Sequence, residues 1–165
     1  MFGDSGLTHI DDTGAARMVD VAAKTVTRRV AVAGAFLEMS PATLEAVISG
    51  NIPKGDVLAA ARIAGIMAAK KASELIPMCH PLSLTHASVT LEPVTGSRTG
   101  ISIRAQAATD AKTGVEMEAL TAAAVAGLTL YDMCKSIEKG MVLSDVMLLS
   151  KEGGVSGPWN REEDL

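Results

Sequence analysis

Aromatic side chains are scarce in this chain of 165 residues, of which they make up 2%, at Phe2, Phe36, Tyr131 and Trp159. Proteins that bind single-stranded nucleic acid stack bases on such rings, and this chain has few to offer. Positive charge is not in excess either, because 15 basic residues stand against 19 acidic ones, for a formal charge of −4. A broad surface for polyanions is therefore not expected, and no nucleic-acid partner is predicted.

Cysteine is scarce too. Cys79 and Cys134 form no Cys-x-x-Cys pair, so neither a zinc knuckle nor a thioredoxin-like site is predicted. The most apolar stretch, residues 57–69, contains Arg62 and is too short to span a bilayer. The first residues lack the basic segment and apolar run of a signal peptide. Free thiols without such a signal predict a protein of the reducing cytoplasm that does not associate with membranes.

The composition is otherwise that of a globular protein, with 48% hydrophobic and 21% charged residues. The length predicts a single domain over residues 1–165. Residues 1–16, rich in Gly, Asp, Ser and Thr, are expected to form an N-terminal arm, and residues 152–165 a mobile tail. Because rings are few, we expect further apolar surface to be buried between subunits.

Local signals predict strands that alternate with helices. Ser40-Pro41 and Asp56 are typical of helix starts, and Gly140 of a helix end. Strands are predicted at 26–39, 82–93, 100–108 and 142–150, and helices at 41–49, 57–75 and 119–139. Apart from the short first helix, the order β-α-β-β-α-β predicts a ferredoxin-like α+β fold, with an antiparallel sheet covered by helices.

The last predicted helix carries a candidate reactive pair. Asp132 and Lys135 are three residues apart and therefore share a helix face beside the apolar stripe. One interpretation is an ordinary surface ion pair, which is worth little. The other is a lysine and a carboxylate at the edge of a pocket, where such groups act as acid and base.

Two other segments leave similar alternatives open. Glu116 and Glu118 converge on one site if their segment is extended, but diverge if it is the first turn of a helix. Cys79 and His80 lie on a short turn between two prolines, which is either structural or fixes the imidazole within a site. With His86 they also suggest a metal-dependent hydrolase, although no third ligand has the usual zinc spacing.

Clusters of cations in an acidic protein suggest a site for a small anion such as phosphate, or else solvated charges on helix ends. One cluster comprises Arg17, Lys24, Arg28 and Arg29, and the other Lys54, Arg62, Lys70 and Lys71. No Walker loop or G-x-G-x-x-G motif accompanies them.

Five segments together resemble one family. They read LTHIDDTGAARMVDV, IPKGDVLAAARIAGIMAAKK, ELIPMCHPL, TGVEMEAL and LTLYDMCKSIEKGM, within residues 7–157. In order and spacing they are similar to the cyclic pyranopterin monophosphate synthases, the C proteins of molybdenum cofactor biosynthesis. The resemblance implies a ferredoxin-like subunit and a homohexamer, a trimer of dimers with active sites at a subunit interface. It also implies a lyase that converts a cyclised dihydro-GTP nucleotide, made by a radical enzyme, to cyclic pyranopterin monophosphate and pyrophosphate.

The resemblance also implies roles for individual residues. Asp132, Lys54 and Lys135 match the catalytic groups of the family. The residues that match its substrate-binding positions are Met78, Cys79, His80, Glu116, Met117, Glu118, Asp20, Lys24, Arg29, Lys70, Lys71 and Lys151. No metal site and no required cofactor are implied, and magnesium is considered only as an ion that binds with the substrate phosphates. One departure is Val155, where the family usually has a lysine. A second hypothesis is a nucleotide-binding protein of the same fold without catalysis.

Overall fold

The computed structural model describes residues 18–155 and 157–161, so the predicted arm at residues 1–16 lies outside the described residues. The elements follow the order β1 (Thr27–Glu38), α1 (Pro41–Ile48), α2 (Val57–Ala69), α3 (Ala72–Leu75), β2 (His86–Val94), β3 (Gly100–Ala111), α4 (Glu116–Cys134), β4 (Val142–Glu152) and β5 (Trp159–Asn160). The strands form one antiparallel sheet in the order β2-β3-β1-β4-β5. The predicted α+β class and the ferredoxin-like order of the first four strands are confirmed.

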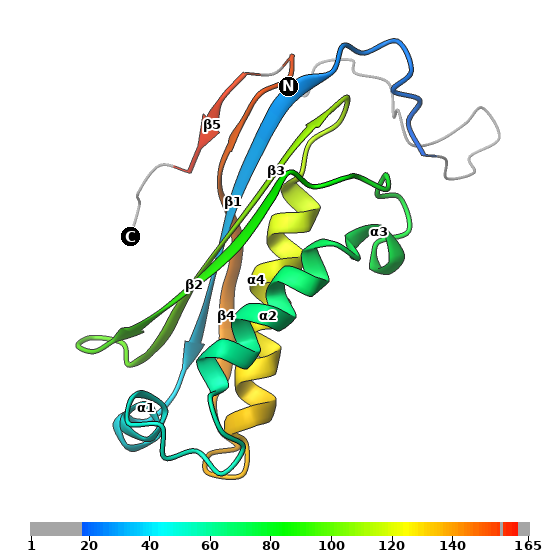
Figure 1. The fold of residues 1–165 in the computed structure, drawn as a ribbon. Helices are drawn as coiled ribbons and strands as arrows, with labels where there is room; N and C mark the ends of the chain where they lie inside the picture. The colour runs from blue at the N-terminus through cyan, green and yellow to red at the C-terminus, as the bar shows by residue number, and fades with distance from the viewer. Residues whose placement is uncertain (1–17, 156, 162–165) are drawn as a thin grey trace, which may run out of the picture.

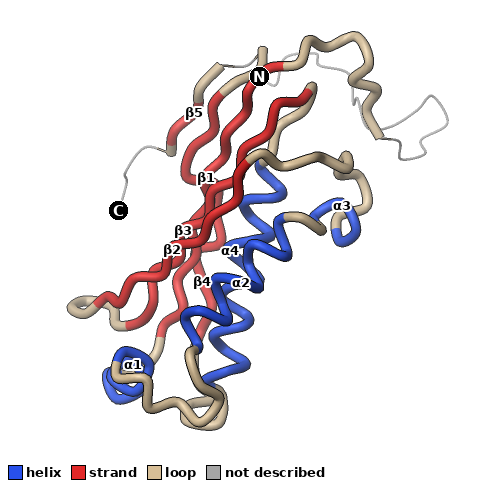
Figure 2. The backbone as a smooth tube through the Cα atoms, viewed as in Figure 1, coloured by secondary structure: helices blue, strands red, loops and turns tan. Residues whose placement is uncertain are grey.

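Helices α2 and α4 cover one face of the sheet and run in opposite directions (Figure 1, Figure 2). Alternate residues of β1, such as Ala33 and Leu37, face these helices and are fully buried. The helices pack closely because their contact residues are small. A Cβ added to Gly65 of α2 would lie 2.8 Å from the backbone oxygen of Ala122 on α4, so the alanine-rich sequence allows the close approach.

Two predicted helices differ from those in the structure. The helix expected at 57–75 is two helices, because the chain turns at Lys70-Lys71 and then buries Ala72. The helix expected at 119–139 runs instead from Glu116 to Cys134. Residues 135–140 form a turn, held by a hydrogen bond from the Tyr131 hydroxyl to the Lys139 carbonyl. Helix α2 ends at Ala69 and α4 at Cys134, so Gly140 does not cap α4.

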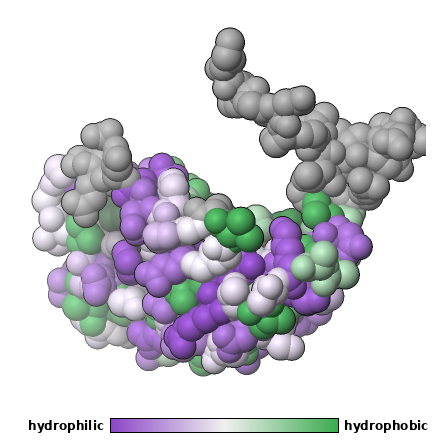
Figure 3. Space-filling view, turned by 90° about the horizontal axis from the view of Figure 1, so that it is seen from above, coloured by the Kyte–Doolittle hydropathy of each residue, from purple (hydrophilic) through white to green (hydrophobic). Residues whose placement is uncertain are grey.

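Two strands also extend beyond the predictions. Strand β3 continues through the expected loop to Ala111, because its partner β1 pairs with it as far as Thr27. Within the segment expected to be a mobile tail, Trp159–Asn160 forms β5 beside Ser150 and Lys151 of β4. Figure 3 looks down on the end of the molecule at which α4 begins, where hydrophilic residues predominate on the described surface. Among the described residues, no helix is both long and apolar enough to cross a membrane.

Candidate active site

The end of α4 brings together three of the predicted site residues. Lys54 lies in the tight turn between α1 and α2, where the Gly55 amide donates to the carbonyl of Ile52. Its Nζ lies 3.0 Å from Oδ2 of Asp132 and donates to the Asp132 backbone oxygen at 2.8 Å. Nζ of Lys135 lies 2.6 Å from the other carboxylate oxygen. Asp132 therefore bridges two ammonium groups, one of which comes from 78 residues away along the chain.

The charges of this lysine–aspartate cluster (Lys54, Asp132, Lys135) are mutually stabilised. Hydrogen bonds from Lys135 and then from Lys54, together with their charges, lower the pKa of Asp132 to about 2. Asp132 in turn raises the pKa of Lys135. Side-chain exposures of 42%, 58% and 51% for Lys54, Asp132 and Lys135 mean that these pairs add little to stability. The arrangement thus places an ionised carboxylate between two ammonium groups at the end of α4.

The opposite end of α4 carries a second group of predicted residues around a pocket of about 340 Å³. The pocket is lined by Val19, Val21, Lys24, Met78, Cys79, His80, Thr113, Gly114, Glu116 and Met117. Nε2 of His80 lies 2.9 Å from the Val19 carbonyl, so the residues before β1 lie against the turn that follows α3. The pocket therefore joins three segments that are far apart in the sequence.

The two glutamates diverge, because they occupy the first turn of α4. Glu116 points to Lys151, with its Oε1 3.0 Å from the Lys151 Nζ. Glu118 is only 3% exposed and lies beneath the pocket, where its Oε1 accepts a hydrogen bond from the Cys79 thiol at 3.5 Å. Its Oε2 is buried without a hydrogen-bond partner among the described residues. The alternative in which both carboxylates converge on one ligand is therefore wrong.

Burial governs the protonation of Glu118 and Cys79. It raises the pKa of the Glu118 carboxyl above its usual value. Burial is also the largest cause that raises the pKa of the Cys79 thiol, to about 11, and the charge of Glu118 adds to it. Cys79 is therefore a thiol at neutral pH and not a nucleophilic thiolate.

The predicted cations fall into two sets. Arg29 and Lys151 line a small recess beside the pocket, together with Glu116. The Arg29 guanidinium is held there by the carbonyls of Ala111 and Lys112, at 3.0 and 3.1 Å. The recess also contains Glu152, and Lys151 is paired with Glu116, so two carboxylates stand beside the two cations.

The other predicted polar residues do not line this pocket. Lys70 and Lys71 lie exposed at the junction of α2 and α3, where Lys71 pairs with Glu74 at 3.8 Å. Asp20 lies between two lining residues, and its carboxylate accepts a hydrogen bond from the Ala22 amide at 2.8 Å. The structure therefore brings most, but not all, of the predicted substrate-binding residues together.

Sequence reasoning missed four lining residues: Val19, Val21, Thr113 and Gly114. Two of them, Thr113 and Gly114, begin the TGVEMEAL segment. A Cβ added to Gly114 would meet the carboxylate of Glu116, which would then have to move. A glycine two residues before an acidic helix start was the available signal.

The two ends of α4 do not form one site within a protomer. Glu116 and Asp132 are 16 residues apart on a continuous helix, which places them about 24 Å from each other. Figure 1 shows α4 extending between these ends of the molecule. Within one subunit, the reacting atoms of a small substrate therefore cannot contact the residues at both ends of α4.

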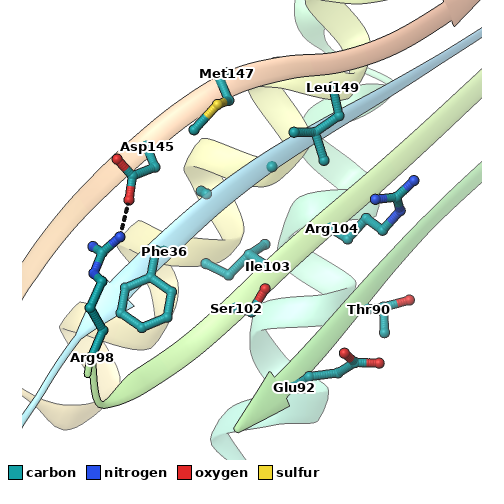
Figure 4. A pocket seen from close by; sticks show the side chains of 12 residues that line it. Phe36, Thr90, Glu92, Arg98, Ser102, Ile103, Arg104, Asp145, Met147 and Leu149 are labelled. Carbon is teal, nitrogen blue, oxygen red and sulfur yellow. Dashed lines mark hydrogen bonds and ion pairs between the residues drawn. The ribbon is translucent and has the colours of Figure 1, made fainter. Parts of the chain in front are cut away.

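A further pocket of about 340 Å³ lies on the sheet face opposite α2 and α4 (Figure 4). Phe36, Arg104 and Met147 are among its lining residues, and an ion pair of 2.5 Å joins Arg98 and Asp145 on one side. It contains none of the predicted site residues. The predicted site residues therefore gather at the ends of α4 and not in this pocket.

The metal-hydrolase hypothesis finds no support in the described residues, in which no three His, Cys, Asp or Glu side chains are grouped to hold a metal ion. His86, at the start of β2, has its Nε2 3.2 Å from the Ser88 hydroxyl.

Comparison with known proteins agrees with the resemblance seen in the sequence. The model of the MoaC family matches residues 18–154. The cyclic pyranopterin monophosphate synthase of Rhodospirillum rubrum is 58% identical over 154 residues, which cover 93% of this chain and 92% of that protein. The synthase of Desulforapulum autotrophicum is 58% identical, with 91% of each chain covered. That of Chloroflexus aggregans is 54% identical, with 95% and 94% covered. This chain belongs to the MoaC family.

Proposed function

We propose that this protein is an enzyme of molybdenum cofactor biosynthesis with the activity for which its relatives are named. It converts 3′,8-cyclo-7,8-dihydro-GTP, supplied by a radical enzyme, to cyclic pyranopterin monophosphate and releases pyrophosphate, as a lyase. Identities of 54–58% over nearly the whole chain support this activity. The observation that carries the proposal is Asp132 bridged between Lys54 and Lys135.

The lysine–aspartate cluster suits a rearrangement that needs repeated proton transfers. Asp132, with its pKa lowered to about 2, is ionised at neutral pH, and Lys135, with its pKa raised by Asp132, is charged. Both shifts come from the contact between these groups, so Asp132 becomes a better proton acceptor and Lys135 a better donor once bound substrate separates them. The ammonium groups also stabilise the charge that develops as pyrophosphate leaves. We therefore assign the catalytic roles to Lys54, Asp132 and Lys135.

The pocket at the start of α4 suits the binding of the nucleotide. Met78, Cys79, His80, Glu116 and Met117 surround a cavity that offers polar atoms to a heterocycle and whose lining contains no Phe, Tyr or Trp ring. Glu118 supports this wall from beneath through the Cys79 thiol.

Cations around this pocket suit a triphosphate. Lys24 lines the pocket, and Arg29 and Lys151 line the adjoining recess. Lys70, Lys71 and Asp20 are assigned more peripheral contacts with the substrate. Val155, which is 98% exposed, supplies no cation where related chains usually have one.

The separation between the two groups supports a site shared by two subunits. Reacting atoms must approach to about 3–3.5 Å, whereas the groups at the two ends of α4 are about 24 Å apart in one protomer. A neighbouring copy supplies the missing end if the two copies are related by a two-fold axis. We therefore propose a homo-oligomer, a hexamer built as a trimer of dimers, with active sites between subunits.

Product analysis tests the activity directly. Purified protein is supplied with the cyclised GTP precursor, and mass spectrometry follows the product and pyrophosphate. We expect both to form in equal amounts. Protein that binds the precursor and GTP analogues, but never converts them, would instead be the non-catalytic nucleotide-binding protein of the second hypothesis.

A chelator titration tests the proposal that no resident metal or other cofactor is required. Turnover is expected to persist in excess chelator, except for any contribution of magnesium that binds with the phosphates. Loss of turnover that only zinc or another transition metal restores would favour the metal-hydrolase hypothesis.

Subunit mixing tests the shared site. Asp132→Asn damages one end and His80→Ala the other, and at substrate concentrations well below KM each variant alone is expected to have low activity. After subunit exchange, mixed dimers contain one intact site, so random 1:1 mixing should restore about a quarter of the wild-type activity. A mixture no more active than its components, although mass spectrometry shows exchange, would place each site within a single protomer.

A further inference from the structure

Glu138 is an ionised side chain to which neither the sequence nor the proposed reaction assigns a role. It lies in the turn after α4, and its Oε2 accepts hydrogen bonds from the backbone amide and the hydroxyl of Ser40, both at 2.9 Å. Ser40 is the N-cap of α1 and is 98 residues away in sequence. One carboxylate therefore ties the turn after α4 to the first residue of α1.

The contact is more than a loose surface pair. Glu138 and Ser40 are both partly buried, and Thr43, which follows Ser40 in α1, is 1% exposed. A hydrogen bond from Thr43 is the largest cause that lowers the pKa of Glu138, and those from Ser40 add to it. The carboxylate thus stays ionised at neutral pH and holds charge-assisted hydrogen bonds, which are stronger than neutral ones.

The same two chain segments meet a second time at the lysine–aspartate cluster. Helix α1 leads directly into the turn that carries Lys54, and α4 ends just after Asp132. In Figure 1 α1, the start of α2 and the end of α4 lie at one end of the molecule. Lys54 has a flexible side chain that is 42% exposed, so it depends on the position of its turn to reach Asp132.

We infer that Glu138 is a positioning residue, whose bonds to Ser40 hold α1 and the following turn so that the Lys54 ammonium group meets Asp132. Lys135 needs no such aid, because it lies three residues from Asp132 on consecutive turns of the chain. Loss of the Glu138 carboxylate therefore releases Lys54 but leaves the pair of Lys135 and Asp132 in place. The geometric part of this inference stands on contacts alone, whereas its effect on turnover rests on the proposed function.

The first test needs no substrate. Wild-type protein and Glu138→Ala are treated briefly with acetic anhydride, and mass spectrometry measures the acetylation rate of each lysine. Release from an exposed ion pair is expected to make Lys54 react about 2- to 5-fold faster, while Lys135 and the distant Lys71 keep their rates. Equal Lys54 rates in the two proteins would overturn the inference.

The second test separates positioning from a general loss of stability. In Glu138→Ala we expect kcat to fall on the order of 10-fold with little change in KM, since the substrate-holding end of α4 is untouched. Glu138→Gln keeps an acceptor oxygen at the same reach and should restore most of the loss in kcat. Glu45→Ala, which removes an exposed carboxylate of α1, is the matched control and should behave as wild type.

Other outcomes are equally decisive. A fall in kcat without faster labelling of Lys54, or a rise in KM alone, would contradict positioning through Lys54. If Glu138→Ala does not fold, Ser40→Ala removes the hydroxyl donor from the other side, and wild-type labelling of Lys54 in that variant would also overturn the inference. Faster labelling of Lys54 in a protein that never converts the precursor would refute the proposed function but leave intact the inference that Glu138 positions the Lys54 turn through Ser40.

Discussion

The two ends of α4 place carboxyl groups in opposite environments. Asp132, at the C-terminal end, is exposed between two ammonium groups, which lower its pKa to about 2. Glu118, at the N-terminal end, is buried beside a thiol, and burial raises its pKa. One helix thus carries at one end a carboxylate that is ionised at neutral pH, and at the other a carboxyl that resists ionisation. The proposed function assigns the charged end to the reaction and the buried end to the wall of the binding pocket.

The strongest test of this division removes an ammonium group from the exposed end. Lys54→Ala and Lys135→Ala are each expected to lower kcat by a factor on the order of 100 or more, because each removes a charge or proton donor from the proposed reaction. Steady-state kinetics with the cyclised precursor measure the change. Lys139→Ala, in the same turn, is the control. Turnover near the wild-type value in either variant would remove the cluster from the mechanism.

The opposite end should affect binding more than turnover. His80→Ala is expected to raise KM about 10-fold with a smaller change in kcat, because it loosens the turn that lines the pocket but removes no group of the lysine–aspartate cluster. The same kinetic assay gives both constants. A large fall in kcat with unchanged KM would contradict the proposal that this end of α4 serves binding more than turnover.

The pH dependence of stability should have opposite signs at the two ends. The raised pKa of Glu118 means that the unfolded chain loses this proton first, so stability falls as pH rises above about 4.5, the ordinary value for glutamate. The lowered pKa of Asp132 makes stability fall as pH drops from 3.8 toward about 2, although its exposure keeps the effect small.

Thermal melts of Glu118→Gln between pH 4 and 8 measure the larger of these two effects. The wild type should lose a few degrees of Tm across this range that the variant does not lose. Parallel curves for the two proteins would show that Glu118 ionises normally in the folded state.

The smallest expected effect concerns the thiol of Cys79. Its pKa of about 11 makes alkylation by iodoacetamide slow at pH 8, since the thiolate is the reactive form. Glu118→Gln removes a nearby carboxylate and should speed alkylation about 3-fold. Mass spectrometry of the Cys79 peptide measures the rate. An unchanged or slower rate would show that burial alone controls this thiol.

Local sequence signals predicted much of the fold. Ser40 caps α1 and Asp56 caps α2, as their residue types indicate, with the Asp56 carboxylate accepting from the Ala59 amide at 2.9 Å. The order of strands and helices then followed from alternation and from glycine and proline stops. The end of α4 and the break after α2 were not predicted, because no glycine or proline lies at either position. The break after α2 is followed by burial of Ala72, and the chain after α4 is held by the hydrogen bond from Tyr131 to the Lys139 carbonyl.

The candidate site also combines features that the sequence predicted with features that only the structure shows. Spacing alone placed Asp132 and Lys135 on one face, because residues three apart are neighbours on any helix. The sequence by itself also determined the MoaC-like motifs and hence the residue types available for chemistry. Only the tertiary structure decided that Lys54 meets Asp132, that Glu118 turns away from Glu116, and that the two groups lie at opposite ends of α4. Such contacts depend on how distant segments pack against each other, which no local periodicity encodes.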